Sequence, residues 1–204
     1  MTYLIVGLGN PGEAHAQTRH NAGRMAVESF ARDQGIADEW VFDKKSAALC
    51  TRGTLVHKAA REKKVDVTLV LPETFMNKSG KAVGTFVKSA KAAEHLVVAY
   101  DDIDLPLGTV RISFGRGSGG HKGVESVMKS IKTKDFVRVR IGIAPTTPAG
   151  KIKKPQGEQK VQNFILGKFK SKEADVLKKV FKKTGAVFET IVTDGLARAM
   201  NMYN

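Results

Sequence analysis

The sequence contains one cysteine, Cys50, so no disulfide can form within the chain. Its longest apolar runs have the length of a strand and fall far short of the roughly 20 residues that a membrane-spanning helix needs. No positively charged segment followed by a cleavage site precedes Tyr3. These absences predict a protein of the cytoplasm, or of an organelle if a leader has been removed, without a membrane partner.

Acidic residues are scarce relative to basic ones. The chain has 34 Lys and Arg against 20 Asp and Glu, which gives a net charge of +14. The stretch from Lys151 to Lys183 contains eleven lysines and three acidic residues, a net charge of +8. Any single lysine can simply belong to a solvated helix face. For the excess as a whole, attraction to the phosphates of a nucleic acid is the better explanation.

The length of 204 residues and a hydrophobic fraction of 42% fit a single α/β domain, residues 1–204, with a substantial core. Hydrophobic periodicity and Gly/Pro positions predict where the elements lie. Helices are expected at 22–34, 74–91, from Val124 and at 171–192, with a short one after Thr193. Strands are expected at 40–51, 55–57, 65–71, 95–100, 109–114 and 136–143, with a turn at Gly53, a charged bend at 58–64 and a polar loop at 145–159. The inward face of the 171–192 helix is expected to carry Val176, Val180, Val187 and Ile191.

The first apolar run, from Tyr3 to Val6, leads into a glycine-rich segment and then into Arg19, His20 and Asn21. Such a run, bounded by Gly and Pro, is typical of a strand covered on both faces, and glycines allow the chain to turn sharply. In open α/β sheets the chemistry usually lies just beyond the carboxyl ends of the strands. Asn10 and His20 are therefore the first candidate functional residues.

Gly7, Gly9 and Gly12 also match the dinucleotide-binding pattern G-x-G-x-x-G. That pattern requires a helix directly after the third glycine and an acidic residue at the end of a second strand. Here the residues after Gly12 lack an apolar helical face, and Asp33 lies inside the helix expected at 22–34. A nucleotide-dependent oxidoreductase is therefore the weaker alternative.

Phe75, Met76 and Asn77 occupy the junction between the strand that ends at Pro72 and the next helix. This junction faces the same edge of the sheet as the candidate residues after the first strand. Phe75 and Met76 can equally be core residues that close the helix end. Asn77 favours the functional interpretation, because an amide both donates and accepts hydrogen bonds and so suits recognition of a peptide backbone.

Three carboxylates, Asp101, Asp102 and Asp104, follow the strand expected at 95–100. Their spacing lacks the number of ligands found in a calcium loop. If the strand continues through them, alternation places Asp101 on one face and the other two on the opposite face. One carboxylate can then be internal while its neighbours are solvated.

A second glycine-rich stretch, residues 115–123, contains His121 and precedes the helix expected from Val124. Backbone amides at the start of a helix can bind an anion or a developing oxyanion. A flexible connector is an equal alternative on composition alone.

Eight segments occur in the order GLGNPG, TRHNAG, TFMNKSG, AYDDIDLP, GGHKG, RVRIGI, NFILGKF and TDGLARAMN. In this order and at these intervals they closely resemble the bacterial-type peptidyl-tRNA hydrolase family, over nearly the whole chain. The resemblance implies a monomeric α/β domain, a twisted mixed β-sheet flanked by helices, with no metal and no cofactor. It also implies hydrolysis of the ester between a peptide and the 3′-terminal ribose of tRNA, so that peptidyl-tRNA is the expected partner.

Ester hydrolysis without a metal needs a base for the attacking water, an orienter for that base, and donors for the oxyanion. An imidazole with an ordinary pKa of about 6.5 is mostly neutral at cellular pH and can act as the base. The resemblance assigns the base to His20 and its orienter to Asp101, and places Asn10 beside them. The residues expected to contact peptide or tRNA are His15, Phe75, Met76, Asn77, Arg111, His121, Lys122 and Arg140.

Two positions depart from the family pattern. Lys122 stands where the family usually has Asn, and His15 stands where it usually has Tyr. An ammonium acts electrostatically but cannot accept a hydrogen bond, whereas a histidine ring keeps a smaller flat surface for stacking. We therefore expect an active enzyme with altered detail. The alternative is an RNA-binding protein without turnover, but binding alone has no need of a base and its orienter, His20 and Asp101.

Overall fold

The computed structural model describes residues 2–36, 39–57 and 63–204. Its strands are β1 (Thr2–Gly7), β2 (Val41–Asp43), β3 (Ala48–His57), β4 (Lys63–Pro72), β5 (Leu96–Pro106), β6 (Val110–Phe114) and β7 (Val137–Ala144). Its helices are α1 (Ala22–Asp33), α2 (Ser79–Phe86), α3 (Ala90–Ala93), α4 (Lys122–Ile131), α5 (Glu158–Leu166), α6 (Ala174–Thr193) and α7 (Leu196–Tyr203). None of the described helices is long and apolar enough to span a membrane.

The seven strands form one sheet in the order β2-β3-β4-β1-β5-β7-β6. The four central strands, β4, β1, β5 and β7, are parallel to one another. The outer strands run antiparallel to their neighbours, β3 and β2 at one edge and β6 at the other. The predicted fold class, an α/β domain with a mixed sheet flanked by helices, is confirmed.

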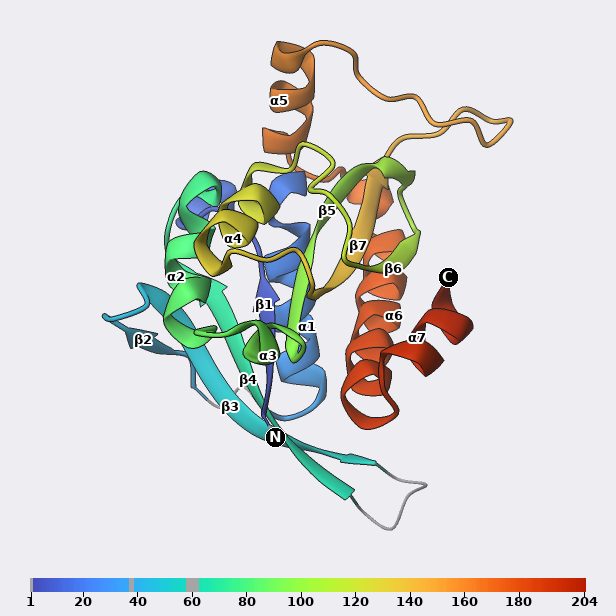
Figure 1. The fold of residues 1–204 in the computed structure, drawn as a ribbon. Coiled ribbons are helices and arrows are strands. Elements are labelled where there is room, and N and C mark those ends of the chain that lie inside the picture. The colour runs from blue at the N-terminus through green and yellow to red at the C-terminus, as the bar shows by residue number, and fades with distance from the viewer. Residues whose placement is uncertain (1, 37–38, 58–62) are drawn as a thin grey trace.

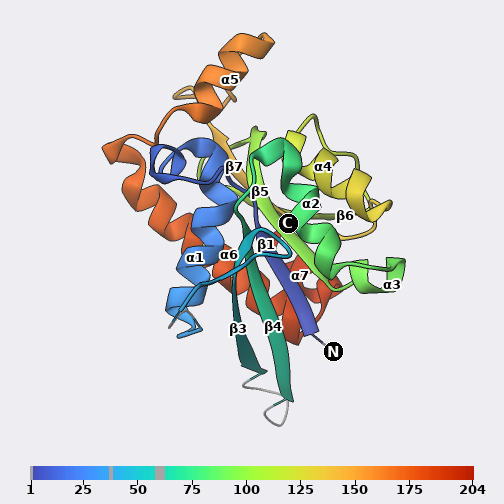
Figure 2. The same ribbon diagram turned by 90° about the vertical axis from the view of Figure 1, so that its left-hand side faces the viewer.

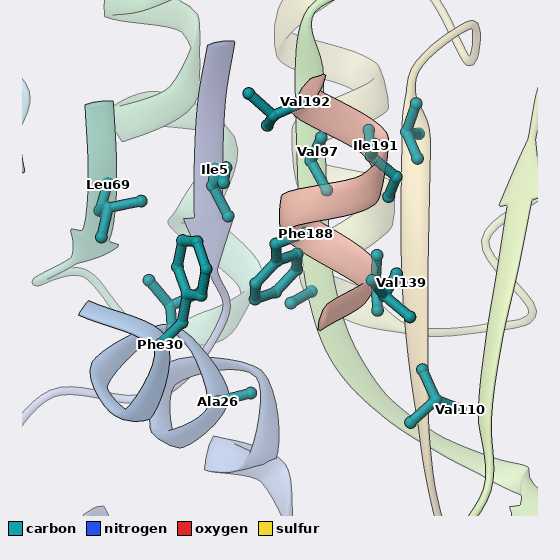
Figure 3. Close-up of a cluster of buried hydrophobic side chains, with 14 of the residues drawn as sticks. Ile5, Ala26, Phe30, Leu69, Val97, Val110, Val139, Phe188, Ile191 and Val192 are labelled. Carbon is teal, nitrogen blue, oxygen red and sulfur yellow. The ribbon is translucent and has the colours of Figure 1, made fainter. Parts of the chain in front are cut away.

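The sheet is the middle of three layers. Helices α1 and α6 cover one face, and α2, α3 and α4 cover the other (Figure 2). Between the sheet and the first pair of helices, Phe30 of α1 meets Phe188 of α6 edge to face at 5.3 Å between ring centroids (Figure 3). Helix α5 stands apart from these layers, above the carboxyl ends of the parallel strands (Figure 1).

Close packing of α1 against β5 brings together segments that are far apart in the sequence. A side chain at Gly23 would collide with the backbone of Ala99 and Tyr100, so only glycine allows the first turn of α1 to approach the end of β5 this closely. The turn before α1 therefore lies directly beside the carboxylates of β5. No α-helix opens at Gly12: a short 3-10 helix, Glu13–His15, follows it, and α1 begins only at Ala22, ten residues after Gly12. The dinucleotide-binding arrangement is therefore not formed.

The prediction of one strand over 40–51 is wrong, because a turn interrupts it between β2 and β3. The carboxylate of Asp43 accepts hydrogen bonds from the backbone of Lys45 and Ser46 and fixes this turn locally. The turn expected at Gly53 is also wrong. Strand β3 continues straight through Gly53, whose missing side chain leaves space for Ile36. Most of the bend expected at 58–64 lies outside the described residues.

The helix expected at 74–91 is broken into α2 and α3. The hydroxyl of Ser89 accepts the backbone N–H of Ala92 and starts α3 as a separate helix. The loop expected at 145–159 is shorter by two residues, because α5 begins at Glu158. On α6, Val176 is 36% exposed and Leu177 is buried instead, so the apolar stripe begins one position later than predicted.

Candidate active site

A cavity of about 1580 Å³ opens at the carboxyl ends of β1, β4 and β5, with α5 in its wall. It is lined by ten of the eleven sequence-predicted site residues: Asn10, His20, Phe75, Met76, Asn77, Asp101, Arg111, His121, Lys122 and Arg140. The eleventh, His15, lies at the rim, where its ring contacts the exposed ring of Phe75 edge to face at 6.5 Å between centroids. The structure therefore gathers these residues around one space.

His20 and Asp101 form a buried pair at the floor of the cavity. Nδ1 of His20 lies 2.9 Å from Oδ1 and 3.1 Å from Oδ2 of Asp101, and both residues are less than 10% exposed. Burial lowers the pKa of His20, but the charge of Asp101 and its hydrogen bond outweigh burial and raise that pKa above its ordinary value. The pair is therefore arranged to stabilise a protonated His20.

His121 binds the same carboxylate. Its Nε2 lies 3.0 Å from Oδ1 of Asp101, and its ring centroid lies 5.0 Å from that of His20. Burial raises the pKa of Asp101, but the charges and hydrogen bonds of the two imidazoles hold it well below its ordinary value. Asp101 is therefore ionised throughout the physiological range. The expected alternation along β5 is confirmed, since Asp102 turns instead to Arg140.

The hydrogen bonds determine which nitrogen of each ring is free. Nδ1 of His121 accepts the backbone N–H of Val124 at 3.3 Å, so its Nε2 carries the proton donated to Asp101. His20 donates from Nδ1 to Asp101, which leaves its Nε2 with a lone pair. Among the described residues, Nε2 of His20 has no hydrogen-bond partner, and His20 lines the cavity.

Asn10 is held by three hydrogen bonds. Asn21 clamps its backbone from both sides, accepting its N–H at 2.8 Å and donating to its C=O at 2.9 Å. The side-chain Oδ1 of Asn10 accepts the backbone N–H of Met76 at 2.8 Å. Because Oδ1 is occupied, the side chain presents Nδ2, a donor, to the cavity that it lines.

Arg19 connects the turn that carries His20 to the chain after α5. Nη1 of its guanidinium donates to the carbonyls of Gly167 and Lys168, and Nη2 donates to both carboxylate oxygens of Glu173. It also stacks between the rings of Phe164 and Phe169, 4.7 and 5.1 Å from their centroids. These contacts fix the turn at Arg19–Asn21 against the segment that leads away from α5.

Basic side chains line the open part of the cavity. Arg140 pairs with Asp102 at 2.7 Å and Lys154 with Asp104 at 2.5 Å, while Arg111 and Lys122 are exposed and have no ion pair among the described residues. The predicted phosphate-binding residues Arg111 and Arg140 therefore face the same space as His20.

The ligand atoms of His20, Asp101 and His121 lie within 4.8 Å of one another, close enough to hold one metal ion. The same atoms are already hydrogen-bonded to one another, so a metal would have to displace both protons that point at Asp101. The absence of a metal and of a cofactor stays a prediction.

Sequence reasoning did not single out Arg19, Asn21 and Tyr100. Arg19 and Asn21 flank His20 in the segment TRHNAG, so their position was a usable signal. Their partners are not visible in the sequence, because Asn21 bonds to a residue 11 positions away and Arg19 to one 154 positions away. Tyr100 precedes Asp101 within an apolar strand pattern, which hid the fact that it lines the cavity.

A mixed sheet with a buried histidine–carboxylate pair beyond its strand ends is typical of α/β hydrolytic enzymes. Comparison with known proteins specifies the class, because the family model described as peptidyl-tRNA hydrolase matches residues 4–204. The chain belongs to the peptidyl-tRNA hydrolase family, as its eight sequence segments indicated.

Individual relatives agree with this assignment. The peptidyl-tRNA hydrolase of Thermodesulfovibrio yellowstonii is 38% identical over 204 residues, covering 98% of each chain. That of Syntrophotalea carbinolica is 37% identical over 202 residues, covering 98% of this chain and 96% of the relative. The crystal structure of peptidyl-tRNA hydrolase from Acinetobacter baumannii superposes with a TM-score of 0.82 at 35% identity, covering 100% of this chain and 94% of that one.

Proposed function

We propose that the chain hydrolyses the ester between the peptide and the 3′-terminal ribose of peptidyl-tRNA, acting as a monomer without a metal. The observation that carries the proposal is the His20–Asp101 pair, buried at the floor of a cavity with the lone pair of His20 Nε2 unoccupied. Family membership supplies the substrate class.

His20 acts as the general base. Its Nε2 takes a proton from water while the water oxygen attacks the ester carbonyl carbon, and Asp101 stabilises the imidazolium that forms. When the tetrahedral intermediate collapses, the same proton passes to the departing 3′ oxygen of the ribose. The products are the peptide carboxylic acid, which then loses its remaining proton to solvent, and tRNA with a free 3′ hydroxyl, and His20 is neutral again.

His121 does not compete for this role, because both of its ring nitrogens are engaged. Nδ1 accepts from Val124 and Nε2 donates to Asp101. Its function is to hold the carboxylate of Asp101 in place and ionised.

Asn10 and Asn77 select a peptide over a free amino acid. The Nδ2 of Asn10 offers a donor to a peptide carbonyl, and the exposed amide of Asn77 can donate and accept. A free α-amino group, with a pKa of about 8, is largely protonated at neutral pH and offers only donors. Such an ammonium opposes Nδ2 of Asn10, which is also a donor.

Phe75 and Met76 line the part of the cavity beside these amides, and the ring of His15 meets that of Phe75 edge to face at the rim. Arg111 and Arg140 bind the phosphates of the tRNA acceptor end. Lys122 supplies positive charge near the developing oxyanion, a role that needs no acceptor atom.

The test is release of peptide from N-acetyl-aminoacyl-tRNA, with unblocked aminoacyl-tRNA as the second substrate. The wild-type protein is expected to hydrolyse only the blocked substrate, and His20→Ala is expected to lose at least a hundredfold in kcat. His95→Ala is the matched control, since His95 contacts Tyr3 rather than the site. Binding of tRNA without hydrolysis by the wild type would instead identify an RNA-binding protein.

A further inference from the structure

Tyr100 is a buried polar residue whose hydroxyl lacks a partner. The residue is 3% exposed and lines the cavity, and no hydrogen-bond partner for its hydroxyl lies among the described residues. Its ring packs on His121 at 4.8 Å between centroids. Burial, assisted by the charge of Asp102, raises the pKa of Tyr100 to about 12, so the phenol keeps its proton. A phenol O–H that has no partner, in a residue that lines the cavity, is available to donate to a ligand.

The register of the sheet places Tyr100 at the inner end of a row of cationic residues. Tyr100 on β5 pairs with Arg140 on β7, and Arg140 pairs with Arg111 on β6. Paired residues on neighbouring strands point to the same face of a sheet, with strands about 4.8 Å apart. The row therefore runs from the exposed Arg111 inward to Tyr100, whose neighbour in the chain is Asp101.

A buried cation lies behind this row. Arg138 is fully buried two residues before Arg140, and so faces the same side of the sheet. Its guanidinium donates only to the carbonyls of Gly117 and Lys134, and no carboxylate forms an ion pair with it in the described part of the chain. A buried charge without a counter-ion favours an anionic group nearby. Arg140, by contrast, is compensated by Asp102.

We propose that the Tyr100 hydroxyl donates a hydrogen bond to the 5′ phosphate of the terminal nucleotide of the substrate. This inference rests on the proposed function. The ester must lie next to Nε2 of His20, and the 5′ phosphate of the same nucleotide lies one ribose away. Within the row, Tyr100 is the donor closest to the His20–Asp101 pair. Arg140 and Arg111 lie farther out, where they can bind the phosphates of the nucleotides that come before the terminal one in the tRNA.

Two small substrates that differ by one phosphate test the proposal: the 3′ N-acetyl-aminoacyl esters of adenosine 5′-monophosphate and of adenosine. Tyr100→Phe keeps the ring on His121 and removes only the hydroxyl. It is expected to raise KM for the phosphorylated ester about tenfold, as for loss of a hydrogen bond to a charged oxygen. KM for the adenosine ester, and kcat for both esters, are expected to change less than twofold.

Tyr3→Phe is the matched control. It removes a phenol hydroxyl near the start of β1, at the end of the strand away from the cavity, and should leave the ratio of the KM values for the two esters as in wild type. An equal effect of Tyr100→Phe on both esters, or none, would overturn the proposal. If Tyr100→Phe does not fold, Tyr100→His, which keeps a flat ring with an N–H donor, is compared instead and should retain part of the preference for the phosphate.

Binding of adenosine 5′-monophosphate and of adenosine, measured by calorimetry, separates this inference from the proposed function. If the wild type fails to hydrolyse N-acetyl-aminoacyl-tRNA, the proposed function fails. If the wild type binds the monophosphate more tightly than adenosine and Tyr100→Phe does not, the phosphate contact is still established. If Tyr100→Phe keeps this preference, the phosphate contact is refuted.

Discussion

Asp101→Asn tests the pair at the centre of the proposed mechanism by removing one charge and keeping the shape. The remaining carbonyl oxygen can occupy the position of Oδ1, which now accepts from both His20 and His121 at 2.9 and 3.0 Å. The new amide nitrogen replaces Oδ2, which lies 3.1 Å from His20 Nδ1. The substitution therefore removes the negative charge at nearly constant shape, and it also places an N–H donor beside Nδ1 of His20, which favours the tautomer with its proton on Nε2.

The size of the effect follows from the separation of the charges. The imidazolium and carboxylate charges are delocalised and lie about 4 Å apart, where an effective dielectric constant near 20 gives an attraction of about 4 kcal/mol. Loss of that attraction from the transition state corresponds to a decrease in kcat of about a thousandfold. The pH dependence should change as well. Because Asp101 raises the pKa of His20 against the effect of burial, Asp101→Asn should lower that pKa.

The sign of the pH effect is fixed by the role of His20, which must be neutral to act as a base. In the wild type, kcat/KM should rise with pH through a pKa above the ordinary value of about 6.5. In Asp101→Asn this rise should move to lower pH while the plateau falls. The assay is kcat/KM for N-acetyl-aminoacyl-tRNA between pH 5 and 9.

Asp66→Asn is the control for loss of one negative charge, since Asp66 is exposed on β4 and bonded to Thr54. It should leave both the plateau and the position of the rise unchanged. A plateau in Asp101→Asn within tenfold of wild type would refute the electrostatic role. A large loss with no movement of the rise would show that Asp101 acts only by orienting the ring.

Three further substitutions test the surroundings of the pair. Asn21→Ala leaves the backbone N–H and C=O of Asn10 without partners, so urea unfolding should show a loss of about 2–4 kcal/mol in the free energy of unfolding and kcat/KM should fall; unchanged kinetics would contradict the clamp. Arg19→Met leaves Glu173 without its ion-pair partner and should cost about 3 kcal/mol, whereas Arg198→Met at an exposed pair should cost less than about 0.5 kcal/mol; equal losses would refute the anchoring role. Lys122→Asn should change kcat for N-acetyl-aminoacyl-tRNA more than twofold, and a smaller change would show that position 122 does not matter here.

Motif order predicted the fold class and the members of the candidate site because both depend on where strands end. His20, Asn77 and Asp101 each follow or complete a buried apolar run, and in parallel strands those ends meet at one edge. Element boundaries were less predictable where one side chain decides them. The carboxylate of Asp43 makes the β2–β3 turn and the hydroxyl of Ser89 starts α3, and neither signal interrupts the hydrophobic pattern around it.

Contacts between distant side chains were outside the reach of the sequence. Nothing in the spacing of Arg19 and Glu173 indicates that they pair across 154 positions. The clamp of Asn21 on Asn10 is equally hidden, since it depends on the return of the chain through the turns between residues 12 and 21. Such bonds follow from the packed fold, which local propensity and periodicity do not encode.

The two histidines of the site show how local structure resolves what composition leaves open. His20 and His121 both lie near glycine-rich segments, and both contact Asp101, so residue type alone gives either one the capacity to be the base. The start of α4 breaks this symmetry. Because His121 caps that helix, the N–H of Val124 occupies its Nδ1 and forces its proton onto Nε2, toward the carboxylate. His20 precedes α1 without capping it by its side chain, so its Nε2 remains free for water. The proposed assignment of the base to His20 thus rests on which of the two histidines caps a helix.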